Sequence, residues 1–197
     1  TNSIIHNTVN SCLFSLGNRM LVANTQLSNS GGYTVCLIGG KVEFIHCTIA
    51  NYQQLVTRNG PAVVLANYLI GSTGTDTIGY PLQFTGINCL VAGSNTEELG
   101  FALTSTFPRE ITFSHSLLQT GYNLGTAAVQ CQFTRDPHFL KLGRQEEQYV
   151  YDFRIDSVSP ARQLADPQEA AKYPLDLSGK TRWTDEGPDA GAYEYHP

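Results

Sequence analysis

The sequence predicts an all-β protein of the parallel β-helix class, in which three short strands recur every 21–22 residues and an irregular C-terminal cap follows. The prediction depends on the stretch from Val42 to Asn51, a pattern with a polar anchor that returns along the chain. The anchors are Asn2, Asn24, His46, Asn67, Asn88 and His115. Successive anchors are 22, 22, 21, 21 and 27 residues apart. A period near 21 residues indicates a repeat architecture before any other fold.

Apolar residues occupy equivalent positions in the copies. The position three residues after the anchor holds Ile5, Leu27, Ile49, Ile70, Val91 and Leu118. The position four residues before it holds Met20, Val42, Val63, Phe84 and Ile111. The position two residues before it is also apolar, with one gap at Gly86. These columns predict an interior of stacked apolar side chains, because strands in register place equivalent residues about 4.8 Å apart.

Alternating polarity and glycine breakers divide each copy into strands. Strands are expected at 34–38, 42–45, 47–50, 54–57, 63–65 and 68–70. The anchors His46 and Asn67 form the corners between them. A sharp corner needs positive φ, which Asn and His tolerate better than most residues, and Asn side chains can bond along a stack. We therefore interpret His46 and His115 as members of a polar corner ladder and not as catalytic groups.

Loop length varies where stacked repeats tolerate variation. Polar connections rich in breakers at 71–76 and 93–100 join one copy to the next. The interval before His115 is the longest, and residues 95–108 can supply the extra length as an excursion. Insertions on one side of a repeat stack commonly form its binding face.

Charge is concentrated towards the C-terminus. Residues 1–110 hold five acidic and four basic side chains, whereas residues 111–197 hold twelve and eight. The open end of a β stack exposes unpaired backbone and apolar interior, so a charged cap is expected there. We divide the chain into repeat units at 1–133 and a C-terminal capping region at 134–197 within one structural domain.

The repeat rhythm fades after Leu118. One more strand is expected at 126–133, an edge strand at 149–155 and a helical turn at 167–172. Because Thr1 already lies within a copy, we also expect the chain to be the C-terminal part of a longer protein.

Four motifs follow one another in the C-terminal region. They are Asp136-Pro137-x-Phe139, Ser159-Pro160-Ala161, Asp176-x-x-Gly179-x-x-Arg182 and Pro188-Asp189-x-Gly191-Ala192-Tyr193-Glu194-Tyr195. This order resembles the ending of choice-of-anchor Q domain proteins, common in Bacteroides-like bacteria, except that Arg162-Gln163 replaces the usual apolar-acidic pair. The preceding repeats resemble the pectate-lyase-like superfamily. The resemblance implies a right-handed β-helix and export to the cell surface or beyond, but it implies no reaction, because this fold hosts lyases, hydrolases, adhesins and passive stalks.

Composition excludes several classes of function. A net charge of −5 without clustered Lys or Arg argues against nucleic-acid binding. No run of apolar residues is long enough for a transmembrane segment. The five cysteines show no CxxC spacing, which disfavours a zinc site. Cys47 and Cys89 lie two copies apart, roughly 9–10 Å, so we interpret the cysteines as unpaired small hydrophobic residues.

Catalytic groups are sparse. A glycosidase needs two carboxylates converging on one face. The repeat region offers Glu43, Asp76, Glu97, Glu98 and Glu110. No two of them share a column in neighbouring copies, so we interpret them as solvated loop charges and expect no glycosidase site.

A polysaccharide lyase needs a base, which Arg58 or Arg109 could supply, but we favour the interpretation that each of them solvates a corner. The acidic group Asp185, Glu186 and Asp189 could hold calcium, but its spacing matches no EF-hand and capping turns explain it as well. We therefore expect no metal or cofactor, with calcium as the alternative.

Sugar binding requires only exposed aromatic rings and amides. The candidates are Tyr33, Tyr52, Gln53, Gln54, Tyr80 and Asn95. We expect a monomeric, secreted or cell-surface scaffold that binds a glycan or adheres without catalysis. The alternative is a polysaccharide lyase, or another carbohydrate-active enzyme, whose catalytic groups lie partly outside this chain. An alternative fold, a propeller of 42-residue double copies, is less favoured because the 21-residue copies align equally well.

Overall fold

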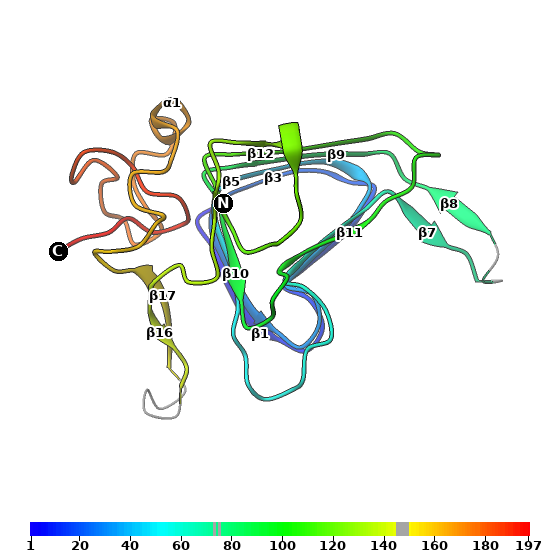
Figure 1. The fold of residues 1–197 in the computed structure, drawn as a ribbon, viewed down its shortest axis with the longest axis horizontal. Helices are drawn as coiled ribbons and strands as arrows, with labels where there is room; N and C mark the ends of the chain where they lie inside the picture. The colour runs from blue at the N-terminus through cyan, green and yellow to red at the C-terminus, as the bar shows by residue number, and fades with distance from the viewer. Residues whose placement is uncertain (73, 75, 145–149) are drawn as a thin grey trace.

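The computed structural model describes residues 1–72, 74, 76–144 and 150–197. They form an all-β structure, as predicted (Figure 1). The strands are β1 Ile4–Thr8, β2 Leu13–Leu16, β3 Arg19–Ser30, β4 Val35–Ile38, β5 Gly40–Asn51, β6 Val63–Ala66, β7 Tyr68–Ile70, β8 Thr77–Gly79, β9 Leu82–Ile87, β10 Leu90–Gly93, β11 Leu99–Ala102, β12 Arg109–Ser114, β13 Leu117–Leu118, β14 Ala128–Val129, β15 Gln132–Phe133, β16 Phe139–Leu142 and β17 Tyr151–Ile155. The described helical elements are the 3-10 turn η1 (Gly125–Ala127) and the helix α1 (Pro167–Ala170).

Parallel pairing builds two sheets. The large sheet consists of β1, β3, β5, β9, β10, β12, β13, β14 and β15. The small sheet consists of β2, β4, β6 and β11. We call one small-sheet strand, together with the large-sheet strands that follow it, a unit. Units stack in parallel register, and the two sheets enclose an apolar interior between them (Figure 1).

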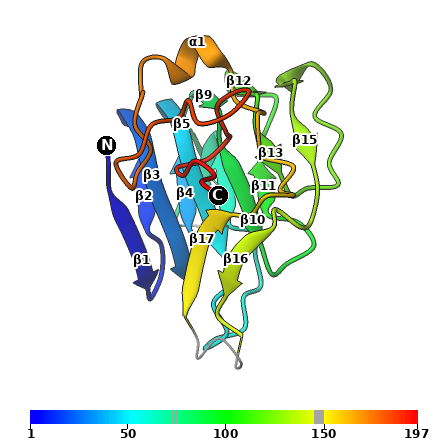
Figure 2. The same cartoon turned by 90° about the vertical axis from the view of Figure 1, so that its left-hand side faces the viewer.

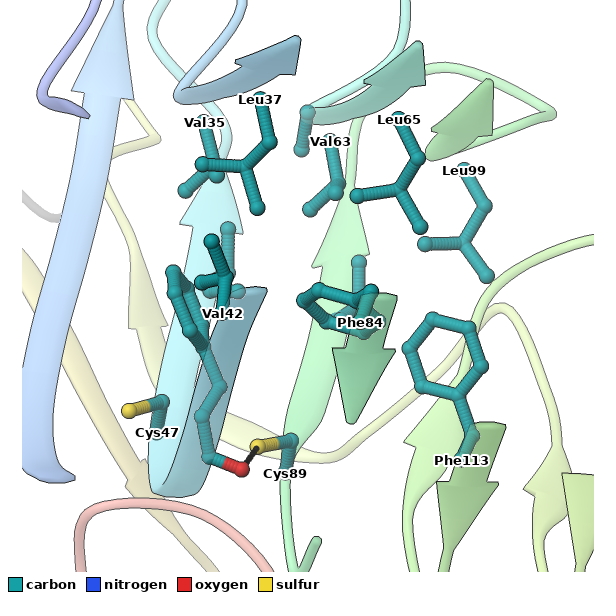
Figure 3. Packing of buried hydrophobic residues seen from close by; sticks show 14 of the residues in the cluster. Val35, Leu37, Val42, Cys47, Val63, Leu65, Phe84, Cys89, Leu99 and Phe113 are labelled. Atoms are coloured by element: carbon teal, nitrogen blue, oxygen red, sulfur yellow. Dashed lines mark hydrogen bonds between the residues drawn. The ribbon is translucent and has the colours of Figure 1, made fainter. Parts of the chain in front are cut away.

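The predicted apolar columns are present in the large sheet. Met20 pairs with Val42, Val42 with Phe84, and Phe84 with Ile111. In the second column, Leu27, Ile49 and Val91 lie side by side in the same way. These side chains form the main buried cluster together with Val35, Leu37, Val63, Leu65 and Leu99 of the small sheet. Figure 3 shows most of these residues pointing towards one another from the two sheets.

The single glycine in the apolar columns has a packing reason. Gly86 lies between Phe44 and Phe113 in the large-sheet register. A Cβ at this position would lie 3.0 Å from the ring of Phe113 and 3.3 Å from that of Phe84. The rings of Phe84 and Phe113 meet with centroids 5.2 Å apart (Figure 3). The space left by the missing side chain at Gly86 is therefore filled by the neighbouring aromatic rings.

The corner prediction is confirmed for most anchors. Asn2, Asn24, His46, Asn88 and His115 have φ between 47° and 55°. The Asn24 amide donates to Asn2 Oδ1 at 2.8 Å, and the Asn88 amide lies 3.0 Å from His46 Nε2. Gln130, with φ of 51°, forms a further corner that the sequence pattern missed.

The copy anchored at Asn67 is the exception, and its predicted register is wrong. Val63 pairs with Val35 of the small sheet, not with Val42. The strand β7 pairs antiparallel with β8 in a hairpin that projects from the stack (Figure 1). The Asn67 amide instead donates to the carbonyls of Thr104 and Phe107, at 2.9 and 2.8 Å. Residue type alone did not distinguish a corner residue from one that holds a loop.

Three further strand predictions also need correction. Residues 54–57 form no strand and belong to a loop. The excursion expected at 95–108 contains β11, so only the residues after Ala102 leave the stack. The strand expected at 126–133 is divided into η1, β14 and β15 by the corner at Gln130. The predicted helical turn is confirmed as α1, and β17 confirms the described part of the strand predicted at 149–155, of which residue 149 lies outside the described residues.

The register also corrects the predicted separation of two cysteines. Because Thr48 pairs with Leu90, Cys47 and Cys89 lie on directly adjacent strands and not two strands apart. Both thiols are buried, and they donate to the carbonyls of Val22 and Phe44, each at 3.4 Å. All five cysteines are unpaired, as expected.

The described residues of the range 134–197, which we call the C-terminal segment, pack along the outside of the large sheet (Figure 2). The hairpin of β16 and β17 brings Phe139 and Phe153 against Ala50 and Leu90, which point outwards from the sheet. We expected this segment at an open end of the stack, and these contacts correct that expectation. Outward apolar side chains on β5 and β10 need cover, which explains its place on the flank. The division at residue 134 stays a prediction.

Candidate functional site

The outer face of the large sheet changes character from one strand to the next. In the register, Gln26 of β3 lies beside Thr48 of β5, which lies beside Leu90 of β10. Two residues further along these strands, Ser28 of β3 lies beside Ala50 of β5, which lies beside Ala92 of β10. The C-terminal segment covers the apolar end of this series and leaves the polar end open. A cleft therefore begins where the outward side chains become polar.

This polar cleft has a volume of about 570 Å³. Its floor is formed by residues of β1 and β3, and its opposite wall by β17 with Ser178 and Tyr193 of the C-terminal segment. Figure 2 shows β1 and β3 to one side of β17. Its lining includes the amide of Gln26 and the hydroxyls of Ser28 and Tyr193. The cleft thus combines amides and hydroxyls with the rings of aromatic residues.

A chain of hydrogen bonds orders the floor of the polar cleft. The Tyr193 hydroxyl donates to Gln26 Oε1 at 2.7 Å, and Gln26 Nε2 donates to Ser28 Oγ at 2.8 Å. Burial raises the pKa of Tyr193 to about 12, and the nearby carboxylates of Asp152 and Asp176 add to this. The phenol is therefore uncharged at neutral pH, and its oxygen remains free to accept a bond from a ligand.

One charged pair lies in the polar cleft. Arg154 Nε donates to Asp152 Oδ1 at 3.0 Å, and Nη2 donates to Asp152 Oδ2 at 2.5 Å. Burial acts to raise the pKa of Asp152, but the bonds from Arg154 outweigh it and lower that pKa. Each charge in this bidentate pair neutralises the other, so the cleft offers a ligand little net charge.

A second cleft, of about 420 Å³, adjoins the first. The two clefts share Asn7, Asn29 and Tyr151 in their walls. The second is lined by Val9 together with the loop of residues 53–56. Leu55 and Val9 are 92% and 87% exposed, so this apolar cleft presents its side chains to solvent. We use the name flank groove for the polar and apolar clefts together.

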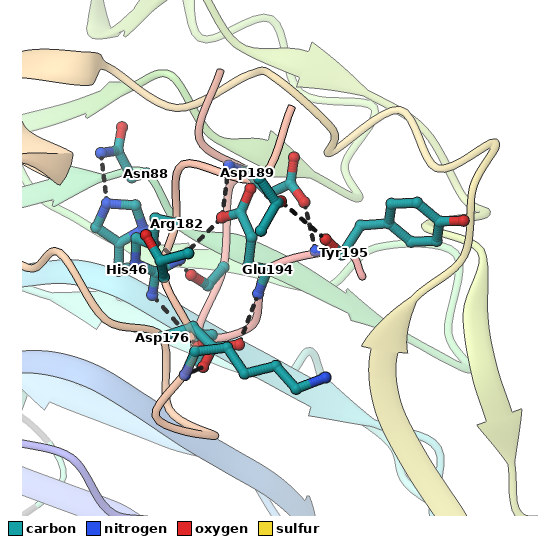
Figure 4. A network of polar contacts seen from close by, with 12 residues as sticks. His46, Asn88, Asp176, Arg182, Asp189, Glu194 and Tyr195 are labelled. Atoms are coloured by element: carbon teal, nitrogen blue, oxygen red, sulfur yellow. Dashed lines mark hydrogen bonds and ion pairs between the residues drawn. The ribbon is translucent and has the colours of Figure 1, made fainter. Parts of the chain in front are cut away.

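Hydrogen bonds from the corner ladder hold the C-terminal segment in place. Asp166 N donates to Asn88 Oδ1 at 2.7 Å, which orients the amide so that its nitrogen donates to His46 Nε2 (Figure 4). His46 Nδ1 lies 3.2 Å from the carbonyl of Gly191. This arrangement suits an uncharged imidazole with its proton on Nδ1. Burial lowers the pKa of His46 well below its ordinary value, and the charge of Arg182 lowers it further.

A buried cluster of charges surrounds Arg182, which is fully buried. Its Nη2 donates to Asn24 Oδ1 at 2.7 Å, and its Nη1 lies 3.6 Å from Glu194 Oε2 (Figure 4). Burial and the charge of Asp189 raise the pKa of Glu194 to about 9. Asp176 accepts from the backbone N–H groups of residues 178, 180 and 194. These contacts identify the motif residues of the C-terminal region as structural groups.

Two residues predicted as solvated charges are in fact buried. Arg58 Nη2 donates to Glu98 Oε1 at 2.6 Å, and neither side chain is more than 2% exposed. Glu98 also accepts from Ala62 N and Asn95 N. Burial raises the pKa of Glu98, although the bonds from Arg58 oppose this. The pair joins two loops, and the guanidinium is not available as a lyase base. The other candidate base, Arg109, lies at the start of β12, where its Nη1 donates to the carbonyl of Thr104.

The predicted tyrosines lie outside the flank groove. Tyr52 is buried against Phe139 and Phe153. The ring of Tyr33 lies over Gly60, and Tyr80 packs against the turn at Gly39. Tyr52 has a packing role, whereas Tyr33 is 41% exposed, as predicted, but lies away from the groove. The expectation that Tyr52 is an exposed sugar platform is therefore wrong.

The predicted amides are divided between the groove and the interior. Gln53 and Gln54 line the apolar cleft. Gln53 Oε1 accepts from the backbone N–H groups of Leu55 and Val56, and Gln54 Nε2 donates to the carbonyl of Gly143. Asn95 lies elsewhere, where its Nδ2 donates to the carbonyl of Gly60.

Two of the three acidic residues considered for calcium, Asp185 and Asp189, have protein partners. The Asp185 carboxylate pairs with Arg162, and Asp189 accepts from Gln163 N and Tyr195 N at 2.8 and 2.7 Å. Within the described ranges, no group of three or more His, Cys, Asp or Glu residues could hold a metal ion. Among the same residues, no helix is long and apolar enough to cross a membrane.

Sequence reasoning missed the residues of the polar cleft. Gln26 and Ser28 were passed over because neither belongs to a predicted loop. The signal that could have found them is the polarity of the residues that point outwards from neighbouring strands. At equivalent positions this polarity changes from the amide of Gln26 to the apolar side chain of Leu90. Tyr193 and Arg154 carry no such signal, because their place depends on how the C-terminal segment folds back. No family model, curated protein or solved structure matches the chain.

Proposed function

We propose that the chain is a right-handed parallel β-helix of a secreted or cell-surface protein, and that its flank groove binds a neutral glycan without catalysis. The parallel pairing of strands within both sheets supports this fold over a propeller of 42-residue copies, because the blades of a propeller are antiparallel sheets. The resemblance of the C-terminal motifs to the choice-of-anchor Q ending supports the cell-surface placement.

The polar cleft is the observation that favours a glycan. It presents the Tyr193 hydroxyl and the Gln26 amide, which are ordered by hydrogen bonds that reach the buried Ser28 hydroxyl. Ordered amides and hydroxyls match the hydroxyl-rich surface of a sugar, because amide and hydroxyl groups can both donate and accept hydrogen bonds. Tyr151, which is partly buried, supplies aromatic surface for the apolar faces of sugar rings.

The charge of the cleft favours a neutral glycan over a uronate. Recognition of a uronate carboxylate uses a free cation, and the Arg154 guanidinium already donates to Asp152 through two nitrogens. The lyase alternative requires both a uronate and an accessible base. Arg58 is buried against Glu98, so the first candidate for that base is excluded.

The test is calorimetric titration of the protein with neutral and uronate oligosaccharides. We expect neutral oligosaccharides to bind and Tyr193→Phe to weaken binding about tenfold, because loss of a hydrogen bond costs about 1.4 kcal/mol. Tyr122→Phe, an exposed tyrosine away from the groove, is the matched control and should bind as the wild type does. Release of unsaturated products from a uronate polymer, or tighter binding of uronates, would refute the proposal.

A further inference from the structure

The two halves of the flank groove differ in chemistry, although they are continuous. Asn7, Asn29 and Tyr151 belong to the walls of both clefts, so a ligand in the polar cleft lies next to the apolar one. The polar cleft contains Gln26, Ser28 and Tyr193. The apolar cleft contains Val9, Leu55 and Val56.

The apolar cleft has a feature that a sugar alone does not explain. Leu55, Val9 and Val56 are 92%, 87% and 52% exposed, yet they gather around one hollow. Gln53 holds the loop in this conformation by accepting from Leu55 N and Val56 N and donating to the carbonyl of Val56. The loop therefore presents its apolar side chains to solvent at a fixed place. Exposed apolar surface that is ordered beside a polar cleft is typical of a binding site.

We propose that the flank groove takes an amphipathic glycoconjugate, with its sugar in the polar cleft and a short alkyl or acyl group in the apolar cleft. The proposal rests on the proposed glycan function and names the ligand class for the same groove. The polar part would bind through Tyr193 and Gln26, and the buried Ser28 hydroxyl holds the Gln26 amide in place. The apolar part would remove Leu55, Val56 and Val9 from water, which is favourable in proportion to the area covered.

The test uses n-alkyl β-D-glucosides and β-D-galactosides with methyl, butyl, hexyl and octyl chains, below their micelle concentrations, in calorimetric titrations of the full chain. We expect affinity to rise with chain length, by up to about fourfold for each methylene that becomes buried. Leu55→Ser should flatten this rise, because it removes apolar surface from the apolar cleft. Tyr193→Phe should instead weaken every member of the series by the same factor.

Controls separate this proposal from the glycan function itself. Val158→Ser changes another exposed apolar residue, 67% exposed and outside the groove, and should preserve the rise with chain length. Leu55 and Val158 are surface positions, so circular dichroism should show both variants folded.

Two results would overturn the inference. Methyl glycoside binding with no dependence on chain length would refute it and leave the glycan function standing. Equal affinity for free hexanol and for the hexyl glycoside would also refute it, because the groove would then be an apolar site that does not recognise sugar. If neither the glycosides nor the neutral oligosaccharides bind, both proposals fail.

Discussion

The interior of the units and the flank beneath the C-terminal segment are both buried, but they are held together by different chemistry. The interior is formed by columns of Val, Leu, Ile and Phe that pack in register. The flank joins Asn24, His46 and Asn88 to Arg182 and Asp166 through directed hydrogen bonds. Apolar packing tolerates exchange among side chains of similar volume, whereas each polar group of the flank needs one particular partner.

The difference has a consequence for how the molecule opens. Interior contacts join every unit to its neighbours, so their loss affects the whole stack. Flank contacts join the stack to a segment that is folded back upon it, so their loss can release that segment alone. Because Tyr193 and β17 form one wall of the polar cleft, the flank also determines whether the groove exists.

The largest expected effect comes from Arg182→Ala. It removes the cation that faces the carboxyl groups of Asp176 and Asp189 in a buried cluster, which should cost about 3–5 kcal/mol. We expect hydrogen exchange to show lost protection in the C-terminal segment, with β4 and β6 still protected. Denaturant titration measures the loss of stability.

Leu65→Ala is the matched interior control. It should cost a comparable amount, about 2–5 kcal/mol, because Leu65 is fully buried in the main cluster. Here protection should fall in both sheets and in the C-terminal segment together. If Arg182→Ala also lowers protection everywhere by the same amount, the flank and the interior unfold as one body and the comparison fails.

The sequence predicted the interior better than the flank, for a physical reason. Columns such as Met20, Val42, Phe84 and Ile111 repeat because stacked strands impose the same environment on each copy. The corners at Asn24 and His46 were predictable for the same reason, since both need positive φ. Asn67 has the same residue type in a different register, so a periodic pattern could not separate it from the corners.

The groove could be predicted only in part. Gln53 and Gln54 were found because loops between repeats are exposed, and both line the apolar cleft. Tyr52 and Arg58 were misjudged because the partners that bury them, Phe153 and Glu98, are distant in sequence. Contacts of this kind follow from the folded path of the C-terminal segment and of the loops, and no local pattern encodes them.

A smaller effect should follow from exchanging one flank group for its closest isostere. Asn88→Asp keeps the shape but removes the N–H groups that face His46 Nε2 and the carbonyl of Asp166. We expect a loss of about 1–3 kcal/mol in urea titrations. Leu37→Met, an exchange of similar volume in the interior, should cost less than about 1.5 kcal/mol. The reverse order of these two losses would show that the interior is the more exacting region.

The last comparison concerns Glu194→Gln, which keeps the uncharged form that Glu194 has in the folded protein at neutral pH. With its pKa raised to about 9 in the folded protein, Glu194 keeps its proton, whereas an unfolded Glu loses it near pH ~4.3. The folded state therefore binds the extra proton, and the stability this provides is lost progressively as pH rises towards 9. We expect the melting temperature of the wild type to fall between pH 7 and 9, and that of Glu194→Gln to fall less. This window avoids His46, whose lowered pKa makes its own contribution disappear only as pH falls below ~6.5. If the melting temperatures of the two proteins fall in parallel between pH 7 and 9, Glu194 is ionised in the folded protein. The balance of charges that we describe around Arg182 would then be wrong.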